Sequence, residues 1–337
     1  MTDTPLPSEF RDFLVKSGLH DGMTPLPAVP LPGGVSSDIW CIDLADGPIC
    51  VKRALPKLKV AADWFAPIER NAFEVRWMQT ANNAVPGATP AILAHDAAAG
   101  MFAMTFLEPN AHTIWKSALL GGHTDAPFAA AVGETLASIH MATLDDPETA
   151  QHFATDQIFH AIRLEPYLVA TARAHPDVAP ALIDLVKVTA RSQIALVHGD
   201  VSPKNILMGP AGPVFLDAEC AWYGDPAFDL AFCLNHFLLK CVYRPNISDA
   251  YLADFLSMTR SYMAAIANCD HAQHIETRAA RLLPGLFLAR VDGKSPVEYI
   301  TKKVDKDRVR DTAKALLSNP ILHLEDVAVA WRRELDR

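Results

Sequence analysis

The chain has 337 residues, of which 50% are hydrophobic and 20% charged, and its formal net charge is −9. This length fits one large domain or two smaller ones, with enough apolar residues for a sizeable core. The acidic balance argues against a surface for nucleic acid or anionic membranes and would suit a cationic substrate. We therefore expect neither nucleic acid nor a membrane as a partner.

The six cysteines show no CxxC pair and no metal-ligand spacing. This pattern is typical of reduced thiols in a cytosolic protein. The first residues lack the basic and apolar regions of a signal peptide, and no apolar run approaches the roughly 20 residues that a membrane-spanning helix needs. We expect a cytoplasmic protein, either a monomer or a homodimer.

The first third of the chain predicts a small antiparallel sheet with few helices. A short helix follows Ser8 and ends at Gly18, and Pro67 is expected as the first residue of a helix that continues over residues 68–81. Apolar runs predict strands at residues 29–31, 39–44, 49–52, 92–96 and 101–107.

Two features of this sheet could serve a phosphate ligand. Glycines and serines lie between the first two strands, where backbone N–H groups can surround a triphosphate, although an ordinary hairpin turn is the alternative; they are Gly33, Gly34, Ser36 and Ser37. Lys52 ends the next strand, and the following helix offers two acidic partners for it, Glu74 and Glu69. We prefer Glu74.

After Glu108-Pro109, a predicted hinge, the pattern becomes helical. We therefore expect an N-terminal lobe over residues 1–108 and a C-terminal lobe over residues 109–337. Apolar periodicity in the second lobe predicts helices at residues 129–141, 158–174, 178–193, 228–240, 252–267 and 327–335.

Residues 196–219 carry the strongest chemical signal. The runs 206–208 and 214–216 are joined by turn formers and predict a β-hairpin. Pairing Ile206 with Leu216 would place Asn205 opposite Asp217, because opposed residues share one face. Asp200 lies on the loop just before. Such hard oxygen ligands suit Mg²⁺ held together with the phosphates of a substrate.

This stretch resembles a known catalytic loop. His198-Gly-Asp200, followed by Asn205, is similar to the loop of the aminoglycoside phosphotransferase-like kinases. Asp217-Ala-Glu219 and then Asp229 continue the likeness in order. The resemblance implies an α+β, protein-kinase-like fold of two lobes, with a small β-sheet lobe and a larger helical one. It also implies ATP and Mg²⁺ as cofactors and a small-molecule hydroxyl acceptor.

The resemblance assigns a role to each candidate residue. Asp200 would orient or deprotonate the acceptor hydroxyl, and Asp229 would support the catalytic loop. Mg²⁺ would be held by Asn205, Asp217 and Glu219. The nucleotide would meet Lys52 with Glu74, the turn at Gly33, Gly34, Ser36 and Ser37, and the hinge backbone of Phe106, Leu107 and Glu108.

Further stretches resemble 5-methylthioribose kinases, including residues 112–116, 217–224 and 235–239. The chain departs from them at Asn205, where those kinases tend to carry a small residue, and at their late pair of arginines, of which only Arg290 has a counterpart. The acceptor could therefore be methylthioribose, an amino alcohol, an aminoglycoside or another polyol. Its pocket is expected to contain Trp222, Tyr223 and Arg290.

Two alternatives are disfavoured. A protein kinase would carry an Asp-Phe-Gly motif and an Ala-Pro-Glu segment, and neither occurs here. A catalytically inactive nucleotide-binding regulatory module would not need Lys52, Asp200, Asn205 and Asp217 together. Absence of turnover with a broad acceptor panel would favour that module.

Overall fold

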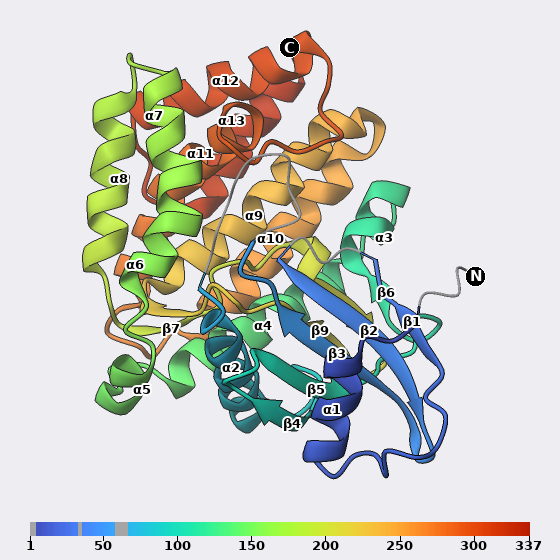
Figure 1. Cartoon of the computed structure of the whole chain (residues 1–337). Helices are drawn as coiled ribbons and strands as arrows, with labels where there is room; N and C mark the ends of the chain where they lie inside the picture. Colours follow the sequence, from blue (N-terminus) through green and yellow to red (C-terminus); the bar gives the residue numbers. More distant parts are fainter. Residues whose placement is uncertain (1–4, 33–35, 58–66) are drawn as a thin grey trace. The chain divides into compact units, whose positions relative to one another are not determined.

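The computed structural model describes residues 5–32, 36–57 and 67–337. The chain divides into two compact units, Met1–Ala111 and His112–Arg337, which Figure 1 shows in blue to teal and in green to red, respectively. Each unit is described by itself below. Gly33 and Gly34, the glycines of the predicted phosphate turn, lie outside the described residues.

The first unit is built on a five-stranded antiparallel sheet in the order β1-β2-β3-β5-β4. Its elements are α1 (Ser8–Lys16), β1 (Ala28–Pro30), β2 (Ser37–Leu44), β3 (Gly47–Ala54), α2 (Arg70–Ala84), β4 (Ile92–Asp96) and β5 (Met101–Thr105). The predicted strands are therefore all present.

Strand β3 has two differently used faces, because successive side chains of a strand point to opposite sides. On one side, Ile49 and Val51 belong to a buried core that includes Phe10 and Phe13 of α1. On the other side, Lys52 is directed to Glu74 of α2. The alternation of the sequence thus separates the apolar core of this unit from its buried ion pair.

Helix α2 begins later than the sequence predicts. Pro67 was expected to open it, but the helix starts at Arg70 and runs three residues further than expected, to Ala84. The Arg70 guanidinium donates to the carbonyl oxygens of Pro67, Ser36 and Leu55 at 2.7, 2.7 and 2.8 Å. These contacts fix the turn at residues 67–69, whose backbone hydrogen bonds span three residues before the α-helix begins.

The second unit is mostly helical. Its helices are α3 (Trp115–Gly121), α4 (Ala126–Ala142), α5 (Pro147–His152), α6 (Asp156–Phe159), the π-helix η1 (His160–Val169), α7 (Ala170–Ala174), α8 (Ala179–Arg191), the 3₁₀ turns η2 (Pro203–Asn205) and η3 (Pro245–Ile247), α9 (Pro226–Tyr243), α10 (Ser248–Ala265), α11 (Ala272–Asp292), α12 (Lys303–Ser318) and α13 (Leu324–Leu335). Its strands are β6 (Thr113–Ile114), β7 (Ala195–Val197), β8 (Ile206–Gly209), β9 (Gly212–Phe215) and β10 (Trp222–Gly224).

Helix α9 is the centre of this unit, since nearly all of its residues are buried. Helices α4 and α10 pack closely against each other, and Gly133 makes this possible, because a Cβ there would lie 2.4 Å from the Met258 carbonyl oxygen. Among the described residues, no helix is both long and apolar enough to cross a membrane.

The C-terminal helices differ most from the sequence-based expectation. The single helix predicted over residues 158–174 is divided into α6, η1 and α7, with Pro166 inside the π-helical part. Helices α11 and α12 were not predicted. Pro284 and Gly285 interrupt the local helical signal of α11, yet both are buried or in close contact in the packed helix, where Gly285 faces Leu185.

Candidate active site

The loop between β7 and β8 carries His198, Gly199 and Asp200. Gly199 has φ +78°, a left-handed conformation that favours glycine. A Cβ at this position would also lie 2.6 Å from the carbonyl oxygen of Cys220. Both the backbone angle and the close approach of the neighbouring segment therefore require glycine between the histidine and the aspartate.

Asp229, in the first turn of α9, is hydrogen-bonded to the backbone of this loop. Its fully buried carboxylate accepts the backbone N–H groups of His198 at 2.7 Å and Gly199 at 2.8 Å. His140 Nε2 lies 3.3 Å from the same carboxylate, and its Nδ1 lies 2.8 Å from the Tyr262 hydroxyl. The expected support of the catalytic loop by Asp229 is confirmed.

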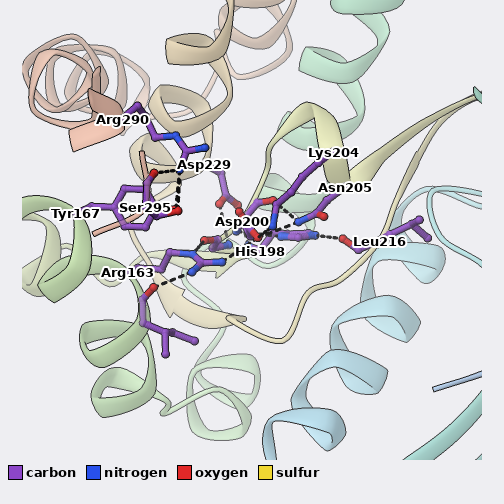
Figure 2. Close-up of polar contacts among 12 residues, drawn as sticks. Arg163, Tyr167, His198, Asp200, Lys204, Asn205, Leu216, Asp229, Arg290 and Ser295 are labelled. Carbon is purple, nitrogen blue, oxygen red and sulfur yellow. Dashed lines mark hydrogen bonds and ion pairs between the residues drawn. The ribbon is translucent and has the colours of Figure 1, made fainter. Parts of the chain in front are cut away.

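His198 ties the loop to the following hairpin. Its Nδ1 accepts the backbone N–H of Asp200 at 3.1 Å, so the ring proton lies on Nε2 and is donated to the Leu216 carbonyl oxygen at 3.1 Å. Burial lowers the pKa of His198, which favours this neutral form. His198 is thus a positioning residue that sets the orientation of Asp200 (Figure 2).

Asp200 is buried and contacts three polar side chains. Its Oδ2 lies 2.9 Å from Arg163 Nη2 and 3.0 Å from Lys204 Nζ, and it accepts Asn205 Nδ2 at 2.9 Å (Figure 2). Burial by itself would raise the pKa of Asp200, but Arg163 and Lys204 outweigh it, so that the pKa lies below its ordinary value. The carboxylate is therefore ionised at neutral pH.

The hairpin after this loop has a different register from the predicted one. Ile206 pairs with Phe215 and Leu207 with Val214, one residue away from the expected pairing, because the turn is tighter than the five-residue loop that we expected. Since a one-residue shift exchanges the two faces of a strand, the regular register does not place Asn205 opposite Asp217. The backbone at Asp217 instead turns into a left-handed conformation with φ 65°.

The donor set around Asp200 can be compared with what Mg²⁺ requires. The Asn205 amide nitrogen donates to Asp200, which leaves the amide oxygen as the atom that could ligate a metal. The negative charge of Asp217 acts on the pKa of Asp200 and Lys204, so it is close to both. Glu219 is half-buried two residues further on.

Among the described residues, no group of three or more His, Cys, Asp or Glu side chains could hold a metal ion. One or two carboxylates, an amide oxygen and phosphate oxygens are a usual Mg²⁺ set, so the residues fit a metal brought with a nucleotide.

In the first unit, Lys52 Nζ lies 2.7 Å from Glu74 Oε1, and both side chains are almost fully buried. Of the two glutamates considered from the sequence, Glu74 is therefore the partner. Ser36 and Ser37 are buried at the start of β2, and the Ser36 carbonyl oxygen accepts Arg70. Phe106, Leu107 and Glu108 form the segment without regular secondary structure after β5.

A cavity of about 200 Å³ lies beside Asp200 in the second unit. It is lined by Lys116, Tyr167, Asp200, Ser202, Pro203, Lys204, Phe232, His236, Arg290, Ser295, Pro296, Val297, Glu298 and Tyr299. Arg290 thus lies where the sequence analysis expected it, next to the catalytic loop.

Trp222 and Tyr223 do not line this cavity, which corrects the expectation that they would. Trp222 is stacked on Phe159 with ring centroids 4.3 Å apart and donates its Nε1–H to Asp156. The Tyr223 hydroxyl donates to the Ile194 carbonyl oxygen at 3.0 Å. Trp222 and Tyr223 follow each other on strand β10, which pairs with β7, so their side chains point to opposite faces of the strand, and both are buried away from the cavity.

Sequence reasoning missed Arg163. This residue lies on the π-helix η1, where its Nε donates to the Gly199 carbonyl oxygen, and the pKa of its guanidinium is raised by Asp200 despite burial. No local motif marks it, since helices α7 and α8 and strand β7 lie between it and Asp200 in the chain. Its only sequence signal is a basic residue in a largely apolar helical segment.

Comparison with known proteins supports this interpretation of the loop. Residues 27–262 match the Phosphotransferase enzyme family, APH, which covers more than half of the chain. The chain belongs to this family. The matched range includes the sheet of the first unit, the catalytic loop with its hairpin, and α9.

Curated relatives of this family member are methylthioribose kinases. It is 24% identical over 310 residues to the methylthioribose kinase of Erwinia tasmaniensis, with 78% of this chain and 75% of that protein covered. It is 22% identical over 224 residues to methylthioribose kinase 1 of Oryza sativa subsp. japonica, with 57% of this chain covered. The aligned part spans about half the length, 51%, of the rice relative.

A solved structure agrees with the fold. Choline kinase of Cryptosporidium parvum Iowa II superposes with a TM-score of 0.57 at 10% identity, covering 96% of this chain and 100% of that one. At this identity the likeness concerns the fold alone. The expected α+β, protein-kinase-like architecture is confirmed.

Proposed function

We propose that this family member is a kinase that transfers the γ-phosphoryl group of ATP, in the presence of Mg²⁺, to a hydroxyl group of a small molecule. The observation that carries the proposal is the ionised carboxylate of Asp200, which Arg163, Lys204 and Asn205 hold beside a small cavity. A cavity of about 200 Å³ suits a small metabolite, because pockets for drug-sized ligands occupy about 300–1,000 Å³.

In this reaction the acceptor oxygen forms a bond to the γ-phosphorus, and the bond between that phosphorus and the leaving oxygen of ADP breaks. Asp200 orients the hydroxyl and takes its proton. Bound Mg²⁺ would offset negative charge on the phosphates, and Asn205, Asp217 and Glu219 are the residues that would hold it.

The residues of the first unit would serve the nucleotide. Lys52, oriented by Glu74, would contact the phosphates, and the backbone of Phe106, Leu107 and Glu108 would meet the adenine. Ser36 and Ser37, together with Gly33 and Gly34, would lie over the phosphates. These roles rest on the family pattern and on the buried Lys52–Glu74 pair.

The test is an ADP-release assay with ATP, Mg²⁺ and a panel that contains methylthioribose, pentoses, amino alcohols, hydroxy acids and aminoglycosides. We expect one class of acceptor to be phosphorylated, and Asp200→Asn to abolish the transfer while nucleotide binding remains. Nucleotide binding without turnover of any acceptor would favour the inactive nucleotide-binding module instead.

A further inference from the structure

The cavity beside Asp200 has more positive than negative charge at its walls. The cationic side chains that line it are Lys116, Lys204 and Arg290, and the acidic ones among the described residues are Asp200 and Glu298. Although the whole chain carries a net negative charge, the side chains that line this cavity carry a net positive charge. The net charge of the chain and the charge of this cavity therefore favour opposite kinds of ligand.

Ion pairs account for two of these cations, and Arg163, which lies outside the lining, shares the carboxylate of one of them. Lys116 Nζ lies 2.6 Å from Glu298 Oε1, and Arg163 and Lys204 both contact Asp200. Arg290 has neutral partners instead. Its Nη1 donates to the Tyr167 hydroxyl at 3.2 Å, to the Ser295 carbonyl oxygen at 2.5 Å and to Ser295 Oγ at 3.1 Å (Figure 2). No carboxylate of the described residues forms an ion pair with it.

The same cavity collects buried polar atoms that lack a hydrogen-bond partner within the described part of the chain. They are Ser202 Oγ, His236 Nε2, Arg290 Nε and Tyr299 OH. Ser202 is 1% and His236 7% exposed. Because buried polar groups are nearly always hydrogen-bonded, several of them at one cavity indicate a ligand that supplies the partners.

The chemistry of these atoms indicates what kind of ligand that is. Arg290 Nε carries a hydrogen and can only donate, and the hydroxyl groups of Ser202 and Tyr299 can both donate. Burial, and then the charges of Lys240 and Arg290, lower the pKa of His236 well below its ordinary value, so it is neutral and can also donate one hydrogen bond. A ligand rich in acceptor oxygens satisfies all four.

We propose that the acceptor is a small hydroxylated anion, with a carboxylate or phosphate group that binds Arg290 and a hydroxyl group that lies at Asp200. This inference rests on the proposed kinase function and narrows its substrate class. A guanidinium binds carboxylate or phosphate through paired N–H groups. A quaternary ammonium or an amino sugar would instead bring a second cation next to an unpaired one.

The experiment uses pairs of acceptors that share a polyol skeleton, in which one member carries an anionic group at one end. Glycerate and glycerol form one pair, gluconate and sorbitol a second, and glycerol 3-phosphate and glycerol a third, which separates phosphate from carboxylate. Choline, ethanolamine and methylthioribose complete the panel. We expect the anionic member of at least one pair to have a KM at least tenfold lower than its neutral partner in the ADP-release assay.

Variants connect this preference to Arg290. Arg290→Gln should raise the KM for the anion at least tenfold and change that for the neutral partner by less than twofold, while Arg290→Lys should retain part of the preference. Arg281→Gln is the matched control, since Arg281 lies on the same helix, is 40% exposed and pairs with Asp184 outside the cavity. The melting temperature of each variant verifies that it is folded.

Binding measured by calorimetry separates this inference from the proposed function. If no acceptor is phosphorylated but an anion of the panel binds and Arg290→Gln abolishes that binding, the kinase proposal fails and the anion site stands. If a neutral or cationic acceptor is used as well as or better than its anionic counterpart, the kinase stands and the anion site is overturned. Absence of both transfer and anion binding also overturns it.

Discussion

The catalytic loop and the cavity beside it are constructed in opposite ways. At the start of the loop, around His198 and Gly199, the polar groups are matched within the protein: Asp229 accepts two backbone N–H groups, and both ring nitrogens of His198 are hydrogen-bonded. In the cavity, Ser202, His236, Arg290 and Tyr299 each present a buried polar atom that has no partner in the described part of the chain.

The hydrogen-bonding groups around His198 are positioned before the reaction, whereas those of the cavity stay free until a ligand binds. A catalytic carboxylate benefits from preorganised neighbours, because its geometry then needs no adjustment during the reaction. A binding pocket has to leave hydrogen-bonding capacity free, which costs stability until the ligand arrives. Substitutions in the loop should therefore affect the free protein, whereas those in the cavity should mainly affect the acceptor.

The largest effect is expected for Asp200→Asn. The amide keeps the size of the side chain but cannot take the acceptor proton, and general-base catalysis contributes about 10²–10⁴-fold to a rate. We expect kcat to fall by about this factor with little change in nucleotide affinity. Asp184→Asn, at an exposed position of α8, is the control. Retention of more than a tenth of the activity would contradict the assigned role.

Arg163→Met should be the most destabilising change among the neighbours of Asp200. It leaves a buried carboxylate with one cation fewer and removes the donor to the Gly199 carbonyl oxygen. Loss of one partner from a buried pair costs on the order of 3 kcal/mol. The measurement is urea unfolding. Lys204→Met is the comparison, because Lys204 is 53% exposed and should cost less than about 1 kcal/mol.

Asp229→Asn tests the anchor of the loop. The asparagine offers one acceptor oxygen, so its NH₂ group has to face one of the two backbone N–H donors. We expect a loss of about 1–3 kcal/mol in the free energy of unfolding, measured by urea titration, and slower phosphoryl transfer. An unfolding midpoint equal to that of the wild type would show that the two hydrogen bonds are not required.

The pH dependence of the melting temperature of Lys240→Met tests the buried state of Lys240. Burial lowers the pKa of Lys240 to about 7, compared with about 10.4 for an unperturbed lysine. Below pH 7 the folded protein therefore contains a buried, charged ammonium group, whose burial lowers the free energy of unfolding. As the pH rises from 7 towards 10, this lysine becomes neutral in the folded protein and the destabilisation disappears. We expect the variant to melt at a higher temperature than the wild type at pH 6, with an advantage that shrinks by pH 9.5. An advantage independent of pH would contradict the shift.

The smallest effect on stability is expected for Ser202→Ala. Its hydroxyl lacks a partner among the described residues, so its removal should change the free energy of unfolding by less than about 0.5 kcal/mol or stabilise the protein slightly. The KM for the acceptor should rise instead. Destabilisation as large as that of Asp229→Asn would remove the distinction between the loop and the cavity.

The sequence predicted the parts of this protein that depend on local spacing. Apolar runs identified the strands of the first unit, and the interval from His198 to Asp217 identified the catalytic hairpin. The predicted register of that hairpin was wrong by one residue, because a loop of turn formers does not reveal how many of its residues belong to the turn. Trp222 and Tyr223 were misplaced because proximity in sequence to Asp217 does not determine the direction of a side chain.

By itself, the sequence determined the catalytic loop, the lysine strand and the family, because each of these lies within a short segment whose spacing is fixed by backbone geometry. The tertiary structure alone decided that Arg163 and His236 meet Asp200 and its cavity, whereas Arg290 was expected there from the family resemblance. Arg163, His236 and Arg290 come from η1, α9 and α11. Their convergence results from helix packing, which buries apolar faces over the whole unit and leaves no periodic signal at the polar residues that it brings together.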